Sequence, residues 1–172
     1  FEMMVEDGSQ EILKLLSSTS SKIAQGEVSQ LEYKSEIDVL EETYFKIINS
    51  KTAQLFAAAT RVGACITNKN KKEKDALESY GRNLGLAFQI ADDVLDYYST
   101  NNIFGKEIGK DFYEGKVTLP AIFVYQKANT NERTFLEKIF KKKNRSEEEF
   151  NETQSLIKKY GSTATCFKRA EH

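Results

Sequence analysis

Apolar residues recur at helical spacing along most of the chain. Two groups show this most clearly: Ile12, Leu13, Leu16 and Ile23, and then Leu40, Tyr44, Ile47 and Ile48. Residues three, four and seven positions apart lie on one face of an α-helix, and no sustained alternation of period two indicates β-strands. The pattern therefore predicts an all-α protein, built as a bundle of helices.

Helix boundaries in the first part of the chain are predicted from glycine and from short polar segments. Gly26 is expected to end the first helix, because glycine favours the position just after a helix C-terminus. Ser50-Lys51-Thr52 is expected to interrupt the next helical region. The small-residue run 53–59 then predicts a helix that a neighbouring backbone approaches closely.

The second half of the chain is predicted to contain one long helix followed by shorter ones. Residues 71–98 keep the helical pattern, and the apolar stretch 84–88 within them is expected to be mostly buried. Glycines make residues 101–116 a turn-forming segment. A helix start is predicted at Thr118, with proline in the first turn, and a capping box is predicted at Ser146.

The composition limits the size and the partners of the protein. With 172 residues, 40% of them hydrophobic, the chain is expected to form a single domain over residues 1–172. The 25 basic residues nearly balance the 26 acidic ones, so the net charge of -1 gives no general attraction to nucleic acid. No apolar run reaches the roughly 18 residues of a spanning helix, so no integral membrane association is expected.

Cysteine and histidine usage argues against redox and histidine chemistry. Cys65 and Cys166 lie far apart and suit a reduced intracellular protein. His172 is the only histidine and the last residue, which argues against histidine-based catalysis and histidine-rich metal sites. A cytoplasmic location is expected, with an organelle matrix as the alternative.

Three aspartates and a glutamine share one stripe of the long predicted helix. Gln89, Asp92, Asp93 and Asp96 fall at i, i+3, i+4 and i+7, so they project within an arc of about 100°. Carboxylates at this spacing repel one another among apolar neighbours, so a cation is expected beside them. Mg²⁺ suits carboxylate oxygens and completes its coordination with water and substrate phosphate. The alternative is a solvated acidic helix face.

A glycine-punctuated segment with three lysines follows the acidic stripe. Lys106, Lys110 and Lys116 can present ammonium groups, and the backbone can present N–H donors, to a phosphate group. A solvated surface loop would have the same composition. Asp111 either completes a water-mediated metal shell or pairs with Lys110.

Lys51 and Thr52 form a third candidate element. In isolation they are a charged residue and a hydroxyl at a helix break. Together with the acidic stripe, Lys51 is a candidate phosphate clamp. The Thr52 hydroxyl, its backbone carbonyl and the Gln89 amide oxygen are dipoles that can face a developing carbocation.

In their order along the chain, these segments resemble the trans-isoprenyl (polyprenyl) diphosphate synthases. The resemblance covers about residues 12–120, and the remainder agrees only in being helical. It implies a helical bundle of the isoprenoid synthase type. The matching motifs are Gln25-Gly26-Glu27 with Gln30, Lys51-Thr52-Ala53, Phe88-Gln89 with Asp92-Asp93 and Asp96, Gly105-Lys106, Gly109-Lys110-Asp111, and Glu114-Gly115-Lys116-Val117-Thr118-Leu119-Pro120.

The resemblance implies a metal role for the acidic stripe. Asp92, Asp93 and Asp96 match aspartates that bind Mg²⁺ bridging to an allylic diphosphate in that family. Asp111 and Lys110 are expected near the metal rather than bound to it.

The resemblance also implies roles for the lysines and for the polar pair. Lys51, Lys106 and Lys116 match lysines that contact the diphosphate. Thr52 and Gln89 match residues that help to stabilise the allylic cation, so with Lys51 they are the candidate catalytic residues.

The implied activity is that of a Mg²⁺-dependent prenyltransferase. An allylic diphosphate loses pyrophosphate, the double bond of isopentenyl diphosphate attacks the resulting cation, and loss of a proton gives a longer polyprenyl diphosphate. The resemblance further implies a homodimer. Two alternatives remain: a class I terpene cyclase with the same ionisation chemistry, and a non-catalytic regulatory subunit of a heteromeric synthase.

One departure from the family pattern concerns completeness. The family's first aspartate-rich motif, and the arginine pair that follows it, do not occur in this sequence, and the first residue is Phe1 rather than methionine. We therefore expect the central-to-C-terminal portion of a longer synthase, with N-terminal helices missing. This chain alone is expected to be inactive.

Overall fold

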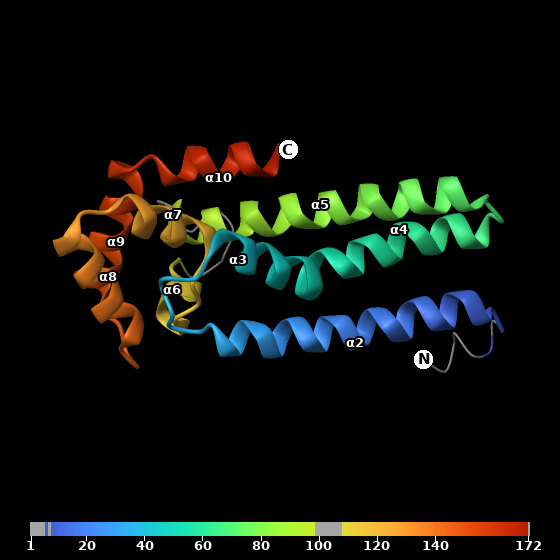
Figure 1. Ribbon diagram of the computed structural model, residues 1–172, viewed down its shortest axis with the longest axis horizontal. Coiled ribbons are helices and arrows are strands. Elements are labelled where there is room, and N and C mark those ends of the chain that lie inside the picture. Colours follow the sequence, from blue (N-terminus) through green and yellow to red (C-terminus); the bar gives the residue numbers. More distant parts are fainter. Residues whose placement is uncertain (1–5, 7, 99–107, 172) are drawn as a thin grey trace. The chain divides into compact units, whose positions relative to one another are not determined.

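The computed structural model describes residue 6, residues 8–98 and residues 108–171 of the chain. All regular structure in this part is helical, which confirms the predicted all-α class. The elements, whose α-helices are labelled in Figure 1, are α2 (Gln10–Glu32), α3 (Glu41–Ile48), the π-helical turn η1 (Asn49–Ala53), α4 (Gln54–Ile66), α5 (Lys71–Tyr98), α6 (Lys110–Glu114), α7 (Leu119–Lys127), α8 (Thr130–Lys141), α9 (Glu147–Lys159) and α10 (Ser162–Ala170).

The chain divides into two compact units. Unit 1 consists of residues 1–29 and 45–89, and unit 2 of residues 30–44 and 90–172. The helices α2, α3 and α5 each contribute residues to both units. The prediction of a single domain over residues 1–172 stays a prediction.

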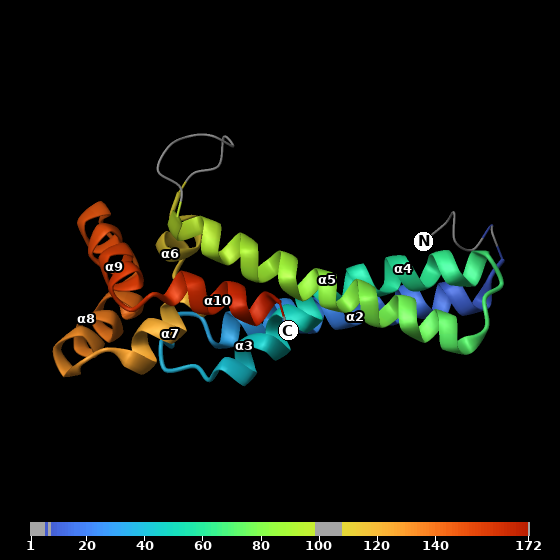
Figure 2. The ribbon, with the colours of Figure 1, turned by 90° about the horizontal axis from the view of Figure 1, so that it is seen from above.

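Small residues bring the helices of unit 1 into close contact. Within this unit, α2, α4 and the first part of α5 run alongside one another (Figures 1 and 2). A Cβ atom added at Gly85 would lie 2.6 Å from the Cα of Ala53, and one at Gly81 would lie 2.5 Å from the carbonyl oxygen of Phe56. Ala57 on α4 is fully buried. The predicted close packing of this small-residue helix is therefore present, with glycines of α5 on the other side of the contact.

Gly26 does not end the first helix. The helix α2 continues through it to Glu32, and a Cβ atom at Gly26 would lie 2.6 Å from the backbone nitrogen of Lys51. Because glycine has no side chain, it allows the two backbones to approach closely, and it does not end the helix. The prediction of a helix end was wrong, because sequence alone does not distinguish these two uses of glycine.

The predicted interruption at Ser50-Lys51-Thr52 is a π-helical turn. The turn η1 joins α3 to α4, and the residues at its two ends, Ile48 and Gln54, both keep right-handed helical backbone angles. In a π turn the hydrogen bond spans five residues instead of four, so the turn is wider but the chain stays helical. The segment therefore separates two α-helices as predicted, but it does so as a π turn inside a continuous helical path rather than as a break.

The apolar stretch 84–88 of α5 is less buried than predicted. Gly85 is buried in the contact with η1, but the side chains of Leu84 and Phe88 are 46% and 55% exposed.

No helix in the described part of the chain is both long enough and apolar enough to cross a membrane.

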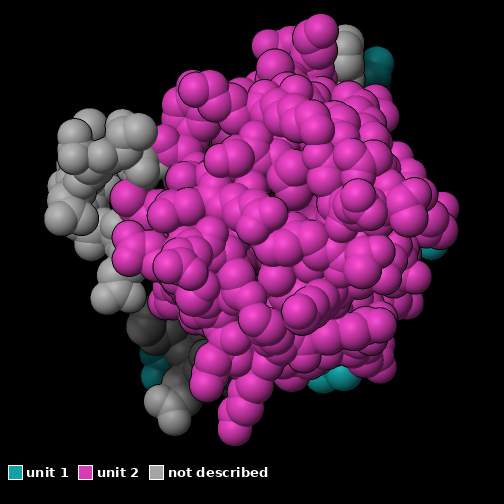
Figure 3. All heavy atoms as spheres, turned by 90° about the vertical axis from the view of Figure 1, so that its left-hand side faces the viewer, with its two compact units in different colours: residues 1–29, 45–89 teal, residues 30–44, 90–172 magenta. Residues whose placement is uncertain are grey.

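The core of unit 2 is built from the short helices that follow α5. Phe112 of α6 is completely buried, and its ring centroid lies 5.8 Å from that of Phe140 and 5.4 Å from that of Phe150. The helix α7 contributes six consecutive buried residues from Leu119 to Val124. Figure 3 shows one face of this unit in magenta. The aromatic cluster anchors α6, which carries candidate site residues.

The predicted helix starts in unit 2 are confirmed. Thr118 is the N-cap of α7, with proline in the first turn. Ser146 caps α9, its hydroxyl accepts the backbone N–H of Glu149, and the Glu149 side chain accepts the N–H of Ser146. These signals are local, so they are readable without the tertiary structure.

Substituting alanine for Gly26 tests the close approach between α2 and η1. We expect Gly26→Ala to destabilise the protein by about 1–3 kcal/mol, because the new methyl group would overlap the backbone at Lys51. The free energy of unfolding, measured with denaturant, checks this. Gly63→Ala is the matched control, since Gly63 also lies inside a helix but a Cβ atom there meets open space. It should stabilise the protein by roughly 0.5–1 kcal/mol. Equal effects in the two variants would refute the close-contact role.

Candidate functional site

The three aspartates of the acidic stripe lie on α5, which has the predicted bounds. Asp93 and Asp96 are only 3% and 2% exposed, and Asp92 is half-buried. Carboxylates at this depth are costly unless polar groups compensate for the lost water. A solvated acidic face is therefore excluded for Asp93 and Asp96.

The Tyr44 hydroxyl is one of the compensating groups. It donates a hydrogen bond of 2.7 Å to Asp93 Oδ2, and both side chains are buried. Burial, and then the charge of Asp93, raise the pKa of Tyr44 well above its ordinary value, so the phenol keeps the proton that it donates. Sequence reasoning missed this role, because Tyr44 fits the apolar pattern of its helix and nothing in that pattern separates it from a core residue.

Asp96 joins the end of α5 to the start of α6. Its Oδ2 accepts the backbone N–H of Asp111 at 3.0 Å, and its carbonyl oxygen accepts the N–H of Gly109 at 2.9 Å. Gly109 has a φ of 76°, a left-handed conformation that favours glycine, and a Cβ atom there would lie 2.7 Å from the Phe150 ring. The turn before α6 is thereby held against the last turn of α5.

The turn after α6 brings Lys116 to the acidic residues. Gly115, with a φ of 77°, ends the helix, and the backbone N–H of Lys116 returns to the carbonyl of Asp111 at 2.9 Å. The Lys116 ammonium lies 2.8 Å from Asp111 Oδ1 and 2.8 Å from Glu114 Oε2. Burial acts to lower the pKa of Lys116, but hydrogen bonds to Asp111 and Glu114 outweigh it and raise the pKa above the ordinary value. Lys116 is therefore a firmly protonated cation.

Tyr97 is a second buried phenol of unit 2. Burial raises the pKa of Tyr97, and the charges of Asp96, Asp111 and Asp93 raise it further. Within the described residues, no three aspartate, glutamate, cysteine or histidine side chains form a group that could hold a metal ion.

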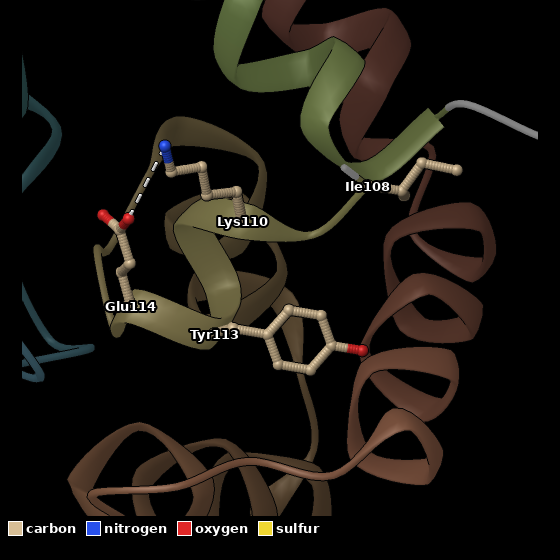
Figure 4. A pocket seen from close by; sticks show the side chains of 4 residues that line it. All are labelled: Ile108, Lys110, Tyr113 and Glu114. Carbon is tan, nitrogen blue, oxygen red and sulfur yellow. Dashed lines mark ion pairs between the residues drawn. The ribbon is translucent and has the colours of Figure 1, made fainter. Parts of the chain in front are cut away.

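The Lys110 side chain is exposed on α6. Its ammonium is 4.0 Å from Glu114 Oε1, beside a pocket of about 530 Å³ that Ile108 and Tyr113 also line (Figure 4). Asp111 pairs with Lys116, so the alternative in which it pairs with Lys110 was wrong. The candidate Lys106, with its neighbour Gly105, lies outside the described residues.

In unit 1 the π turn brings Thr52 to Gln89. The Thr52 hydroxyl donates a hydrogen bond of 2.6 Å to Gln89 Oε1, although the two residues are 37 positions apart. Gln89 is half-buried on α5. Two of the predicted catalytic residues are therefore in direct contact.

Lys51 forms an ion pair on the same turn. Its ammonium lies 3.1 Å from Glu27 Oε2, and Glu27 is the more exposed partner. Glu27 follows Gly26 on α2, so the close approach at the glycine brings the carboxylate to the lysine. Only the resemblance drew attention to Glu27, and it supplied no role for it.

A family model described as Polyprenyl synthetase matches residues 1–157. The chain belongs to the polyprenyl synthetase family. This membership confirms the resemblance seen in the motifs and, with the structural matches below, the fold of the isoprenoid synthase type.

Curated members of this family are similar in sequence to the chain. The octaprenyl diphosphate synthase of Escherichia coli (strain K12) is 43% identical over 122 residues, which are 71% of this chain and 38% of that protein. The short chain isoprenyl diphosphate synthase of Methanothermobacter thermautotrophicus is 36% identical over 167 residues, which are 95% of this chain and 51% of that protein. The chain spans about half the length, or less, of the curated relatives that it matches.

Solved structures of polyprenyl synthases are similar in fold over nearly the whole chain. The polyprenyl synthase of Caulobacter crescentus, complexed with calcium and isoprenyl diphosphate, has a TM-score of 0.94 and 38% identity, and the match covers 99% of this chain and 52% of that one. The decaprenyl diphosphate synthase of Rhodobacter capsulatus has a TM-score of 0.91 and 35% identity, with the same coverage.

Removing the Tyr44 hydroxyl tests its support of Asp93. We expect Tyr44→Phe to lower the free energy of unfolding by about 1–3 kcal/mol at neutral pH, because a buried carboxylate loses a hydrogen-bond donor. Tyr125→Phe is the matched control: the Tyr125 hydroxyl donates to Glu137 at 2.6 Å, but that pair is only partly buried. Its loss should cost less than about 1 kcal/mol. A smaller loss for Tyr44→Phe than for the control would contradict this role.

Proposed function

We propose that the complete protein is a prenyltransferase that joins an allylic diphosphate to isopentenyl diphosphate in the presence of Mg²⁺. The observation that carries the proposal is the similarity, over 99% of this chain, to a polyprenyl synthase whose structure was solved with calcium and isoprenyl diphosphate. A divalent cation and a prenyl diphosphate are the two components that the motifs predict. The products are a longer polyprenyl diphosphate and pyrophosphate.

The reaction needs positive charge around a departing diphosphate. The carbon–oxygen bond of the allylic diphosphate breaks, and pyrophosphate leaves with the electron pair. The double bond of isopentenyl diphosphate then forms the new carbon–carbon bond, and the resulting cation loses a proton. We assign Lys51, Lys106 and Lys116 to the diphosphate, because ammonium groups offset its charge. Lys116 lies beside Asp111 and Glu114, so its ammonium group is held next to the acidic residues of α6.

The acidic residues of α5 suit a metal that is shared with the substrate. We assign Asp92, Asp93 and Asp96 to Mg²⁺, with Asp111 and Lys110 near it. Mg²⁺ favours carboxylate oxygens and fills the rest of its shell with water and phosphate oxygens. When bound, Mg²⁺ supplies charge that stabilises the leaving pyrophosphate. The hydrogen bonds from Tyr44 and from the Asp111 N–H hold two of these carboxylates in place.

We assign Thr52 and Gln89 to the allylic cation. The hydrogen bond from the Thr52 hydroxyl orients the Gln89 side chain through its Oε1. Fixed oxygen dipoles beside a cation stabilise it without having to reorganise during the reaction. The contact between Thr52 and Gln89 in unit 1 directly supports this part of the proposal.

The alternative functions receive no support from the relatives described above. Those relatives carry the names of prenyl diphosphate synthases, not of cyclases or of regulatory subunits.

We further propose that the protein acts as a homodimer in the cytoplasm. Because the chain spans about half of its relatives' length, we expect it to be inactive when it is expressed alone.

Replacing Asp92 tests the metal assignment. We expect Asp92→Ala to slow the formation of prenyl diphosphate by at least about 100-fold in the complete protein, because charge stabilisation of the leaving group is lost. Product chromatography with allylic diphosphate, isopentenyl diphosphate and Mg²⁺ measures the rate and also the chain length of the product.

The matched control for this test is Asp75→Ala. Asp75 also lies on α5, but it is exposed and pairs with Arg61 at 2.7 Å, so its loss should leave turnover unchanged. Equal turnover in the two variants would overturn the metal assignment. No prenyl product from the complete wild-type protein would overturn the proposed function itself.

A further inference from the structure

The side chain of Arg82 on α5 contacts both ends of the π turn. Its Nη1 donates to Asn49 Oδ1 at 3.0 Å and to Gln54 Oε1 at 3.1 Å. Asn49 is the first residue of η1, and Gln54 is the first residue of α4. Lys51 and Thr52 lie between these two contacts. All of these residues belong to unit 1.

The two residues that Arg82 contacts are those that close the π turn. The backbone N–H of Gln54 bonds to the carbonyl oxygen of Asn49, five residues earlier. A π turn is a rare form of helix that needs support from its surroundings. Arg82 joins the side chains of the same pair, so it reinforces the bond that defines the turn. The Gln54 side chain is only 5% exposed, and a buried amide oxygen that lost this donor would be costly.

The width of the turn determines where Lys51 and Thr52 lie. An ordinary α-helical turn has one residue fewer than a π turn. If the segment became α-helical, the residues after it would therefore rotate about the helix axis by about 100° relative to the residues before it. A rotation of that size would separate Thr52 from Gln89 and move Lys51 away from Glu27. The contacts of both candidate residues therefore depend on the π turn.

We propose that Arg82 is a positioning residue that maintains the π turn and thereby places Lys51 and Thr52. The roles of those two residues in binding and catalysis rest on the proposed function, whereas the structural effect of Arg82 does not. A guanidinium suits this task because its planar group directs several N–H donors at fixed angles. A lysine at this position would carry the same charge but could not reproduce that geometry.

Arg61 provides a matched control for the charge of Arg82. Glu78 accepts a hydrogen bond from Arg82 Nη2 at 3.0 Å and another from Arg61 Nη1 at 2.6 Å. Arg61 also pairs with Asp75, but it has no contact with Asn49 or Gln54 among the interactions described for it. Arg61→Met therefore removes a guanidinium from the same network without touching the π turn.

Hydrogen exchange of the complete protein, followed by mass spectrometry, measures the stability of the turn directly. We expect Arg82→Met to increase the exchange rate of amides in the 49–54 segment by about tenfold or more, with a smaller increase in Arg82→Lys. Arg61→Met should leave that segment at its wild-type rate. Equal protection of the segment in Arg82→Met and Arg61→Met would overturn the proposal.

Steady-state kinetics test the consequence for the reaction. We expect Arg82→Met to lower kcat and to raise the KM for the allylic diphosphate, together reducing kcat/KM by at least about tenfold, because displaced groups lose their alignment with the substrate. Arg82→Lys should be intermediate, and Arg61→Met should be unchanged. Wild-type kinetics in Arg82→Met would overturn the positioning role.

The two measurements keep this inference distinct from the proposed function. If the wild-type protein makes no prenyl product, the proposed function fails, and hydrogen exchange still decides what Arg82 does. If Arg82→Met does not fold, Arg82→Lys replaces it in both measurements. In that case wild-type exchange and kinetics in Arg82→Lys would overturn the proposal, and selective loosening of the 49–54 segment would support it.

Discussion

The backbone of the π turn η1 lies against a glycine on each of two neighbouring helices, and the candidate residues of unit 1 depend on this contact. A side chain at Gly26 or at Gly85 would overlap backbone atoms of the turn. On α2, Glu27 directly follows Gly26 and forms an ion pair with Lys51 of the turn. On α5, Gln89 lies one helical turn after Gly85 and accepts a hydrogen bond from Thr52 of the turn. Close backbone packing thus determines the polar contacts.

In unit 2 the corresponding constraint is the compensation of buried charge. Carboxylates at the depth of Asp93 and Asp96 are tolerated only where fixed donors replace water. The Tyr44 hydroxyl and the Asp111 N–H supply such donors, and Lys116 supplies a cation at the next turn. The aromatic core beneath α6 keeps this turn in place. Groups held in this way need little rearrangement when a charged ligand arrives, which is the condition for strong electrostatic stabilisation.

Local signals predicted much of the fold. The long helix α5 has the expected bounds, and the starts of α7 and α9 lie where proline and the capping box indicated. The wrong helix end at Gly26 and the unpredicted π geometry at residues 50–52 have one common cause. A glycine inside α2 and a π turn before α4 each make sense only through the contact between them, and that contact is tertiary. The exposure of Leu84 and Phe88 was also not predicted, because the sequence pattern registers only that these residues are apolar.

The sequence by itself determined the family, the all-α class and the shared stripe of Gln89 and the three aspartates, because helical spacing is a local property of the chain. It did not determine which groups would contact that stripe. The tertiary structure brought Tyr44 to Asp93 across 49 positions, and it paired Asp111 with Lys116 rather than with its neighbour Lys110. These contacts depend on how the helices pack and on which side chains are buried away from water. Residue type and spacing along the chain determine neither the packing nor the burial.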